Sequence, residues 1–242
     1  MRRLLDLALE GLARLALGLF YRRIEVVGAD RLPERGPAVY VGNHGNGIID
    51  PALVMGWFPR SIRFLAKSTL WSQFPIGLFV RLAGAVKVFR QIDPGVDTSR
   101  NRAMFSACWE ILARGGSLCL FPEGISHPEP HLMPLKTGAA RIVLGALHRQ
   151  TDLDLVVVPF GLVFEERERF RSRVLIEIGR PIDPRPWLTP RGERDQESVR
   201  ALTNAIERSL AAVTLNFPSW READLVRRAA SLYVSDEIGR PP

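Results

Sequence analysis

Short apolar runs alternate along the chain with longer stretches whose hydrophobic residues follow helical spacing. The short runs are rich in β-branched residues and poor in polar ones, which is typical of strands covered on both faces of a sheet. Strands are predicted at residues 24–27, 38–41, 62–66, 85–89, 117–120, 155–160 and 174–178. Helices are predicted between them at residues 51–57, 73–82, 98–113 and 138–148. This order predicts a single α/β domain with a mostly parallel or mixed central sheet flanked by helices.

Both ends of the chain depart from this alternation. Leucine dominates the N-terminal segment, but Asp6, Glu10 and Arg14 recur every four residues and leave a wide apolar face. Residues 1–23 are therefore predicted to form an amphipathic helix. Residues 191–242 carry two further helical patterns and are predicted to be a C-terminal helical appendage to an α/β domain at residues 24–190.

The N-terminal helix has two interpretations. Its charged residues interrupt every apolar run before it reaches the roughly 18 residues that a membrane-spanning helix needs. We expect it to lie in a membrane interface, with Arg2, Arg3, Arg22 and Arg23 near anionic head groups. Alternatively, it packs against the rest of the domain. No small-residue cleavage site follows it, which argues against export and favours a peripheral or monotopic protein on the cytoplasmic face of a membrane.

Composition narrows the class of partner. The chain has 242 residues, 46% of them hydrophobic, and its 33 lysines and arginines exceed its 26 acidic residues, giving a formal charge of +7. This charge favours a phospholipid surface, a phosphorylated substrate or nucleic acid. Nucleic acid is not expected, because recognisable binding motifs and interleaved aromatics are missing. Cys108 and Cys119 lie in apolar runs and are predicted to be core residues in a protein of a reducing compartment.

The most informative stretch, residues 39–51, is an apolar run that ends in a Gly/Asn-rich turn. His44 lies in this turn rather than among apolar neighbours, which favours a chemical role. An imidazole accepts and returns protons near neutral pH, so His44 is a candidate general base for a hydroxyl. Asp50 is a candidate partner that orients the imidazole. Alternatively, Asp50 only caps the helix that Pro51 begins.

Cations follow two of the predicted strands. Lys67 lies at the end of one strand, and Lys87 and Arg90 close the next. Cations at strand ends suit a phosphate group. The two lysines could also be solvated strand-end charges, since most lysines are exposed.

A carboxylate follows the strand at residues 117–120, in the sequence Phe121-Pro122-Glu123-Gly124. If this strand runs parallel to the one before His44, Glu123 emerges at the same edge of the sheet, where ligands of open α/β sheets bind. Glu123 could bind a substrate hydroxyl or a cationic side chain, and Gly124 would allow close backbone approach. The alternative is a simple turn.

Three weaker features complete the survey. Pro159 interrupts an apolar strand and Gly161 follows it, so this segment could line an acyl groove or simply end a strand. Residues 165–173 are predicted to be a solvated hairpin of mixed charge. His127 and His131 lack further ligands at suitable spacing, so no metal site is predicted.

Four stretches in this order resemble the four sequence blocks of the glycerolphosphate and lysophospholipid acyltransferase superfamily. They are residues 43–51, 84–90, 121–124 and 158–159, and the resemblance covers about residues 24–182. It implies an enzyme of phospholipid biosynthesis that moves a fatty acyl group from acyl-CoA or acyl carrier protein to a hydroxyl. The acceptor would be a glycerol phosphate or a lysophospholipid such as 1-acylglycerol 3-phosphate, and no cofactor beyond the acyl donor is implied.

The resemblance also implies roles for single residues. His44 would deprotonate the acceptor hydroxyl, Asp50 would orient His44, and the fourth block would lie toward the acyl donor. Arg90, Glu123 and Gly124 would shape the glycerol phosphate site. The residues expected to bind substrate are Asn46, Lys67, Lys87, Arg90, Phe121, Pro122, Glu123, Gly124 and Pro159.

This sequence departs from the family pattern in two places. His44 and Asp50 have five residues between them, one more than is common, as in a glycerolphosphate-acyltransferase-like branch with asparagine at the position of Asn46. The third block commonly ends in Thr-Arg, where this chain has Ile125-Ser126. A phosphate-binding cation would then come from Lys67, Lys87 or Lys136.

Two other functions remain open. A lipid thioester or ester hydrolase could use His44 to activate water, and a non-catalytic module could bind anionic membranes through its basic residues. For an enzyme, the sequence favours direct transfer, because it has no Gly-x-Ser-x-Gly motif and no plausible catalytic cysteine. Backbone N–H groups of the Gly-rich turn or a nearby lysine could stabilise the tetrahedral oxyanion.

Overall fold

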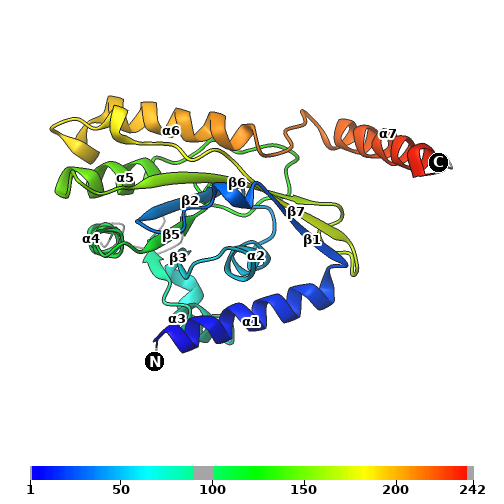
Figure 1. Cartoon of the computed structure of the whole chain (residues 1–242), viewed down its shortest axis with the longest axis horizontal. Coiled ribbons are helices and arrows are strands. Elements are labelled where there is room, and N and C mark those ends of the chain that lie inside the picture. Colours follow the sequence, from blue (N-terminus) through cyan, green and yellow to red (C-terminus); the bar gives the residue numbers. More distant parts are fainter. Residues whose placement is uncertain (1, 90–100, 239–242) are drawn as a thin grey trace.

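A seven-stranded sheet forms the centre of the computed structural model, which describes residues 2–89 and 101–238 (Figure 1). The strands are β1 (Arg23–Val27), β2 (Ala38–Gly42), β3 (Ile62–Lys67), β4 (Val86–Val88), β5 (Ser117–Leu120), β6 (Val156–Phe164) and β7 (Arg173–Ile178). Their order is β1-β7-β6-β2-β5-β3-β4, and all neighbours are parallel except β6 and β7. The predicted α/β fold with a mixed sheet is confirmed.

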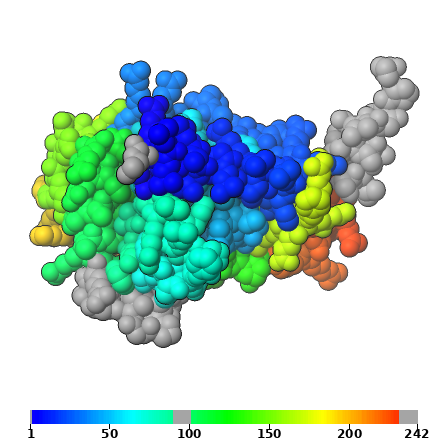
Figure 2. Space-filling model, turned by 90° about the horizontal axis from the view of Figure 1, so that it is seen from below, coloured from blue at the N-terminus to red at the C-terminus, as the bar shows by residue number. Residues whose placement is uncertain are grey.

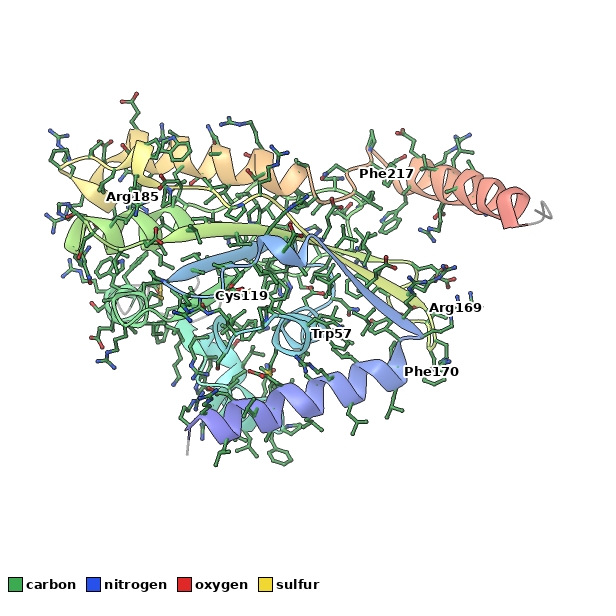
Figure 3. The ribbon with its side chains drawn as sticks, in the orientation of Figure 1. Trp57, Cys119, Arg169, Phe170, Arg185 and Phe217 are labelled. Carbon is green, nitrogen blue, oxygen red and sulfur yellow. The ribbon has the colours of Figure 1, made fainter. Side chains whose placement is uncertain are left out.

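Helices cover both faces of the sheet. The helices are α1 (Arg2–Phe20), α2 (Ile49–Trp57), α3 (Ile76–Leu82), α4 (Asn101–Ala113), α5 (Gly138–Arg149), α6 (Gln196–Ala211) and α7 (Trp220–Ile238). On one face α4, α5 and α6 pack against Val39 and Leu118, and on the other α2 and the end of α1 pack against Tyr40 and Cys119 (Figures 1 and 3). Successive residues of β2 and β5 thus enter opposite apolar cores, which explains why these strands lack polar positions.

Some element boundaries differ from the predictions. β6 continues to Phe164, because its last five residues pair with β7 in a hairpin. The helix predicted at residues 73–82 begins at Ile76, after a short 3₁₀ turn at Ser68–Ser72. The strand predicted at residues 85–89 narrows to β4, and the predicted start of the next helix lies outside the described residues.

The two C-terminal helices differ in their relation to the domain. α6 completes the core with Val199, Leu202, Ile206 and Leu210, all nearly or fully buried. The predicted boundary between the α/β domain and the C-terminal appendage, at residue 191, would therefore separate α6 from the core that it covers. α7 alone extends away from the body of the molecule (Figure 1).

The N-terminal helix packs on the domain through Asp6, Leu9, Ala13 and Leu17, which are its buried residues. Asp6 is 8% exposed and accepts hydrogen bonds from Arg63 and Ser61 at 2.7–2.9 Å. Burial opposes ionisation of Asp6, but the hydrogen bonds and positive charge of Arg63 outweigh it and hold the pKa of the carboxyl below its ordinary value. Nearer the C-terminal end of α1, the Arg14 guanidinium donates to the Gly56 carbonyl of α2.

The leucine face of the same helix points outward. Leu4, Leu7, Leu12, Leu15 and Leu19 are 55–72% exposed. Seen from below, α1 lies across the surface beside α3 (Figure 2). α3 also has two exposed leucines, Leu78 and Leu82. No helix in the described part of the chain is long and apolar enough to cross a membrane.

Both cysteines are buried, as predicted. Burial raises the pKa of the Cys108 thiol to about 12, and it raises the pKa of Cys119 as well. Neither thiol is therefore prepared to act as a nucleophile.

Candidate active site

The turns that follow β2 and β5 leave the sheet at the same edge. The two strands are parallel, with Val41 opposite Leu120, so the chain after each strand emerges on one side. The first turn carries His44 and the second carries Glu123, as the sequence predicted for parallel strands. This edge is where open α/β sheets bind their ligands.

His44 and Asp50 form a direct pair. The His44 Nδ1 lies 2.8 Å from Asp50 Oδ2, and the same oxygen accepts the Asn46 backbone N–H at 2.8 Å. α2 begins at Ile49, so Asp50 lies inside its first turn and is not merely its cap. The longer spacing is accommodated by Gly47, which has φ +46°, a conformation that favours glycine.

Two features fix the plane of the imidazole. It stacks on the Phe121 ring, with centroids 4.3 Å apart and planes at 11°. The Asp50 carboxylate is fully buried, whereas the His44 side chain is 19% exposed and lines a cavity. Because Nδ1 faces Asp50, Nε2 is the ring nitrogen that lies outside this pair.

Glu123 holds the backbone of His44 in place. Its buried carboxylate accepts the His44 backbone N–H at 2.8 Å and the Met133 N–H at 2.8 Å, and it also contacts the His127 Nε2. The His127 N–H in turn donates to the His44 carbonyl at 3.1 Å. The third-block turn thus binds both backbone polar groups of His44. Glu123 was expected to bind substrate; its carboxylate instead points into the protein and does not line the cavity.

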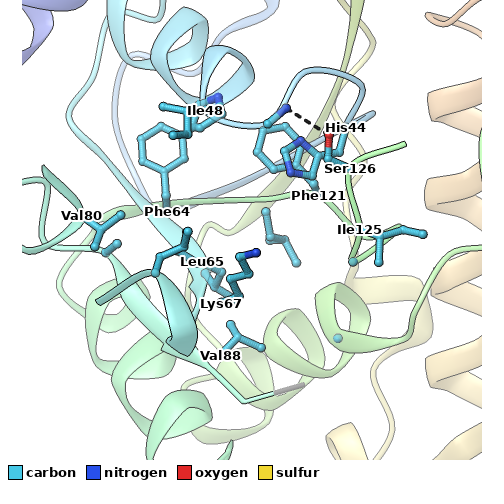
Figure 4. Close-up of a pocket in the computed structure, with 18 of the residues that line it drawn as sticks. His44, Ile48, Phe64, Leu65, Lys67, Val80, Val88, Phe121, Ile125 and Ser126 are labelled. Carbon is cyan, nitrogen blue, oxygen red and sulfur yellow. Dashed lines mark hydrogen bonds between the residues drawn. The ribbon is translucent and has the colours of Figure 1, made fainter. Parts of the chain in front are cut away.

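An apolar cavity of about 430 Å³ lies beside His44 (Figure 4). Its walls come from α2, β3, α3, β4 and the start of α5, and include Phe64, Val80, Val88 and Ile142. Phe121, Pro122 and Gly124, which are predicted to bind substrate, also line it. A cavity with these walls suits a hydrocarbon chain rather than a polar ligand.

Two lysines bring positive charge to this cavity. Lys67 lies at the end of β3, and Lys136 precedes α5. Gly124 has φ +74°, and a Cβ there would lie 2.9 Å from the Lys136 Nζ, so the glycine leaves room for the lysine side chain. The described salt bridges include no carboxylate partner for either lysine.

Lys87 and Pro159, also predicted to bind substrate, lie away from the cavity. Val88 lines the cavity, so the adjacent Lys87 points to the opposite side of β4, where its ammonium lies 5.1 Å from the Trp71 ring centroid. Pro159 is buried in β6 opposite Val41, on the other side of β2 from the cavity. Arg90 lies outside the described residues.

The structure shows which groups Asn46 and Gly161 contact, and the sequence alone did not. Asn46 contributes its backbone N–H to Asp50, and its side chain does not line the cavity. A Cβ on Gly161 would lie 1.7 Å from the Val213 carbonyl, so the close approach expected at this glycine is to the segment after α6.

Sequence reasoning missed two residues at the site. Ser126 Oγ accepts the Gly47 N–H at 3.0 Å and ties the two turns together (Figure 4). Arg167, from the hairpin expected to be solvated, donates to the carbonyls of Gly45 and His127. Nothing in the run of mixed charge at residues 165–173 distinguishes Arg167 from its neighbours. No group of His, Cys, Asp and Glu in the described residues is arranged to hold a metal ion.

These features define an α/β protein with a His–Asp pair beside an apolar cavity at the carboxyl edge of its sheet. The family model named Acyltransferase matches residues 23–163, which is more than half of the chain, and the protein belongs to this family.

Similar proteins include two curated acyltransferases. Glycerol-3-phosphate O-acyltransferase 1 of Saccharomyces cerevisiae is 23% identical over 303 aligned positions, which cover 89% of this chain and 40% of the yeast protein. The chloroplastic 1-acyl-sn-glycerol-3-phosphate acyltransferase LPAT1 of Arabidopsis thaliana is 30% identical over 129 positions, covering 52% of this chain and 34% of LPAT1. The chain thus spans less than half the length of these relatives.

A solved structure has the same fold. The 1-acyl-sn-glycerophosphate acyltransferase PlsC of Thermotoga maritima superposes with a TM-score of 0.60 over 86% of this chain and 80% of that chain, at 20% sequence identity.

Proposed function

We propose that this protein transfers a fatty acyl group from an acyl thioester to a hydroxyl of a glycerol phosphate or a lysophospholipid. The observation that carries the proposal is the His44–Asp50 pair beside an apolar cavity that also receives two lysines. The donor would be acyl-CoA or acyl carrier protein, and no further cofactor is needed. The named activities of the relatives support the same two classes of acceptor.

The proposed reaction is a direct transfer with His44 as the general base. His44 takes the proton of the acceptor hydroxyl while its oxygen attacks the thioester carbonyl carbon. The tetrahedral intermediate then collapses, the carbon–sulfur bond breaks, and the imidazolium returns its proton to the departing thiolate. Asp50 holds the Nδ1–H and stabilises the imidazolium between the two steps.

The contacts of the Gly-rich turn bear on how the oxyanion is stabilised. The N–H groups of His44, Asn46 and Gly47 already donate to Glu123, Asp50 and Ser126. A donor for the oxyanion is therefore better sought in the lysines that line the cavity than in these three amides.

The same lysines are the proposed ligands of the acceptor phosphate. They take the place of the arginine that the family commonly has in its third block. The Lys67→Gln and Lys136→Gln variants should each raise KM for lysophosphatidate about 10-fold or more, because a charge-assisted hydrogen bond contributes roughly 1.5–3 kcal/mol. Lys87→Gln, on the outer side of β4, is the matched control and should leave KM unchanged. Equal KM values for all four proteins would contradict the assignment.

The orientation of α1 supports peripheral attachment to a membrane. A helix that only packed on the domain would bury its apolar face. Here Asp6, Leu9, Ala13 and Leu17 face the domain, and five further leucines are left exposed. We propose that this leucine face enters the interface of an anionic membrane on its cytoplasmic side.

Replacing the exposed leucines should release the protein from lipid. The quadruple variant L7Q, L12Q, L15Q and L19Q should bind vesicles of phosphatidylcholine and phosphatidylglycerol at least 10-fold more weakly, because each change removes apolar surface from the interface. Cosedimentation with vesicles measures this. Leu225→Gln on α7, which is 68% exposed, is the control. Equal loss in the control, or no loss in the quadruple variant, would refute a specific role of α1.

Acceptor-dependent thiol release tests the proposed function. The full chain in detergent is given a long-chain acyl-CoA or acyl carrier protein, with glycerol 3-phosphate, lysophosphatidate or no acceptor. Release that requires an acceptor supports acyl transfer and ranks the two acceptors. Release that is undiminished without an acceptor would instead establish a hydrolase. No release under any condition would favour a membrane-binding module.

A further inference from the structure

Arg167 differs from every neighbour in its hairpin. Between Glu165 and Arg171 it is the one half-buried side chain, and the others are exposed. Its guanidinium points back toward the sheet edge, whereas Arg169 lies at the outer end of the hairpin (Figure 3). The residue also follows the segment matched by the family model, which ends at residue 163.

The guanidinium contacts two carbonyls from separate turns. Arg167 Nη1 donates to the Gly45 carbonyl at 3.2 Å and to the His127 carbonyl at 3.3 Å. Gly45 directly follows His44, and His127 is the residue whose N–H binds the His44 carbonyl. The Arg167 side chain therefore binds the turn that carries His44 and the turn that carries His127 at the same time.

Gly45 provides the space for this contact. A Cβ at Gly45 would lie 3.2 Å from both Cζ and Nη2 of Arg167, so the guanidinium packs directly against the glycine. The φ of Gly45 is not among the positive values, so its backbone conformation is open to alanine. An alanine at this position would therefore have to shift the Arg167 guanidinium by a few tenths of an ångström, although the turn itself would accept it.

Arg167 is itself held from two further directions. The Tyr21 hydroxyl, just after α1, donates to the Arg167 carbonyl at 3.1 Å. The guanidinium carbon lies 5.8 Å from the centroid of the Trp220 ring, at the start of α7. A planar cation with five donors suits a site where two carbonyls and a ring must be contacted at once, and a lysine could not reproduce it fully.

We infer that Arg167 is a positioning residue that clamps the His44 turn to the His127 turn and so keeps His44 in its reactive place. The inference rests on the proposed function for its kinetic consequence. Small displacements of a reacting group reduce catalysis strongly. Loss of the clamp should therefore lower kcat and leave KM nearly unchanged, because Arg167 does not line the cavity.

A double-mutant cycle between Arg167 and Gly45 tests the clamp. Arg167→Ala should lower kcat about 10-fold or more with less than a threefold change in KM. Gly45→Ala should produce a smaller loss, because its Cβ would shift the guanidinium by a few tenths of an ångström. In the Arg167→Ala background, Gly45→Ala should cost nothing further, since the group that it displaces is gone. Arg167→Lys should restore part of kcat, and Arg169→Ala, which removes an exposed ion pair with Glu166, should match wild type.

Hydrogen exchange of the full chain separates this inference from the proposed function. The amides of residues 43–48 and 123–127 should exchange faster in Arg167→Ala, while those of β6 and α5 remain as in wild type. Additive kcat losses in the cycle, or unchanged exchange in both turns, would overturn the clamp. A wild-type protein without acyl transfer would overturn the proposed function, and the exchange result would still decide the clamp.

Discussion

Replacing His44 with alanine should reduce acceptor-dependent thiol release by about 10²- to 10⁴-fold, the usual contribution of a general base. The ring nitrogen that faces the cavity would be lost, and no second imidazole lines the cavity walls in the described residues. The fold should survive, because the side chain is partly exposed and Glu123 and His127 bind only the His44 backbone. Vesicle binding should also be unchanged, since His44 is not one of the exposed leucine-face residues of α1.

The measurement is the rate of thiol release from acyl-CoA with the better acceptor, together with the thermal unfolding midpoint. His148→Ala is a matched control, because His148 is exposed on α5 and does not line the cavity. A His44→Ala protein that folds normally and keeps full activity would remove His44 as the base. Equal losses in both variants would point to a general effect of losing a histidine.

Replacing Asp50 with asparagine should lower kcat on the order of 10²-fold or more, which makes it the second large effect. The amide keeps one oxygen to accept the Asn46 N–H, so the turn should remain folded. It cannot supply the negative charge that stabilises an imidazolium. The buried position of the carboxylate strengthens this effect, because water does not replace the lost charge.

The kinetics of Asp50→Asn should show a reduced kcat with KM within about threefold of wild type, because Asp50 does not line the cavity. Asp152→Asn, an exposed carboxylate beyond α5, is the control and should be silent. A higher KM with an unchanged kcat would assign Asp50 to acceptor binding instead. If Asp50→Asn unfolds, Asp50→Glu should be measured in its place as a variant that restores the negative charge.

The elements that sequence reasoning placed well are those with strong local signals. Apolar runs predicted each of the seven strands in the described residues, and the signal was strongest at β2 and β5, where every position is buried between two helical layers. The turn at His44 was recognisable because an imidazole among glycines and asparagines has no reason to lie in a core. The pairing of His44 with Asp50 followed from chemistry and was then found at 2.8 Å.

The residues that sequence reasoning misplaced depend on contacts between distant segments. Glu123 accepts the N–H groups of His44, which is 79 positions away in the sequence, and of Met133, which is 10 positions away. No local sequence pattern indicates such contacts. Lys67 and Lys87 both lie at or near the end of an apolar strand, so their sequence signals are the same. Only the register of β4 beside β3, which pairs Lys67 with Val88, shows that one lines the cavity and the other does not. The orientation of α1 could not be predicted either, because leucines lie on several sides of the helix. Only its tertiary contacts, such as those of Asp6 with Arg63 and of Arg14 with Gly56, show which side faces the domain.

The double attachment of the His44 backbone limits how this site can be rebuilt. Because Glu123 and His127 bind its N–H and carbonyl, and Ser126 binds the N–H of Gly47, the turn after β2 is moulded to the turn after β5. Grafting a relative's shorter His-to-Asp loop into this chain would leave the buried Glu123 carboxylate with mismatched donors. Chimeras should therefore exchange residues 43–50 and 121–127 as one cassette, and libraries that vary one of these loops alone should yield few active members.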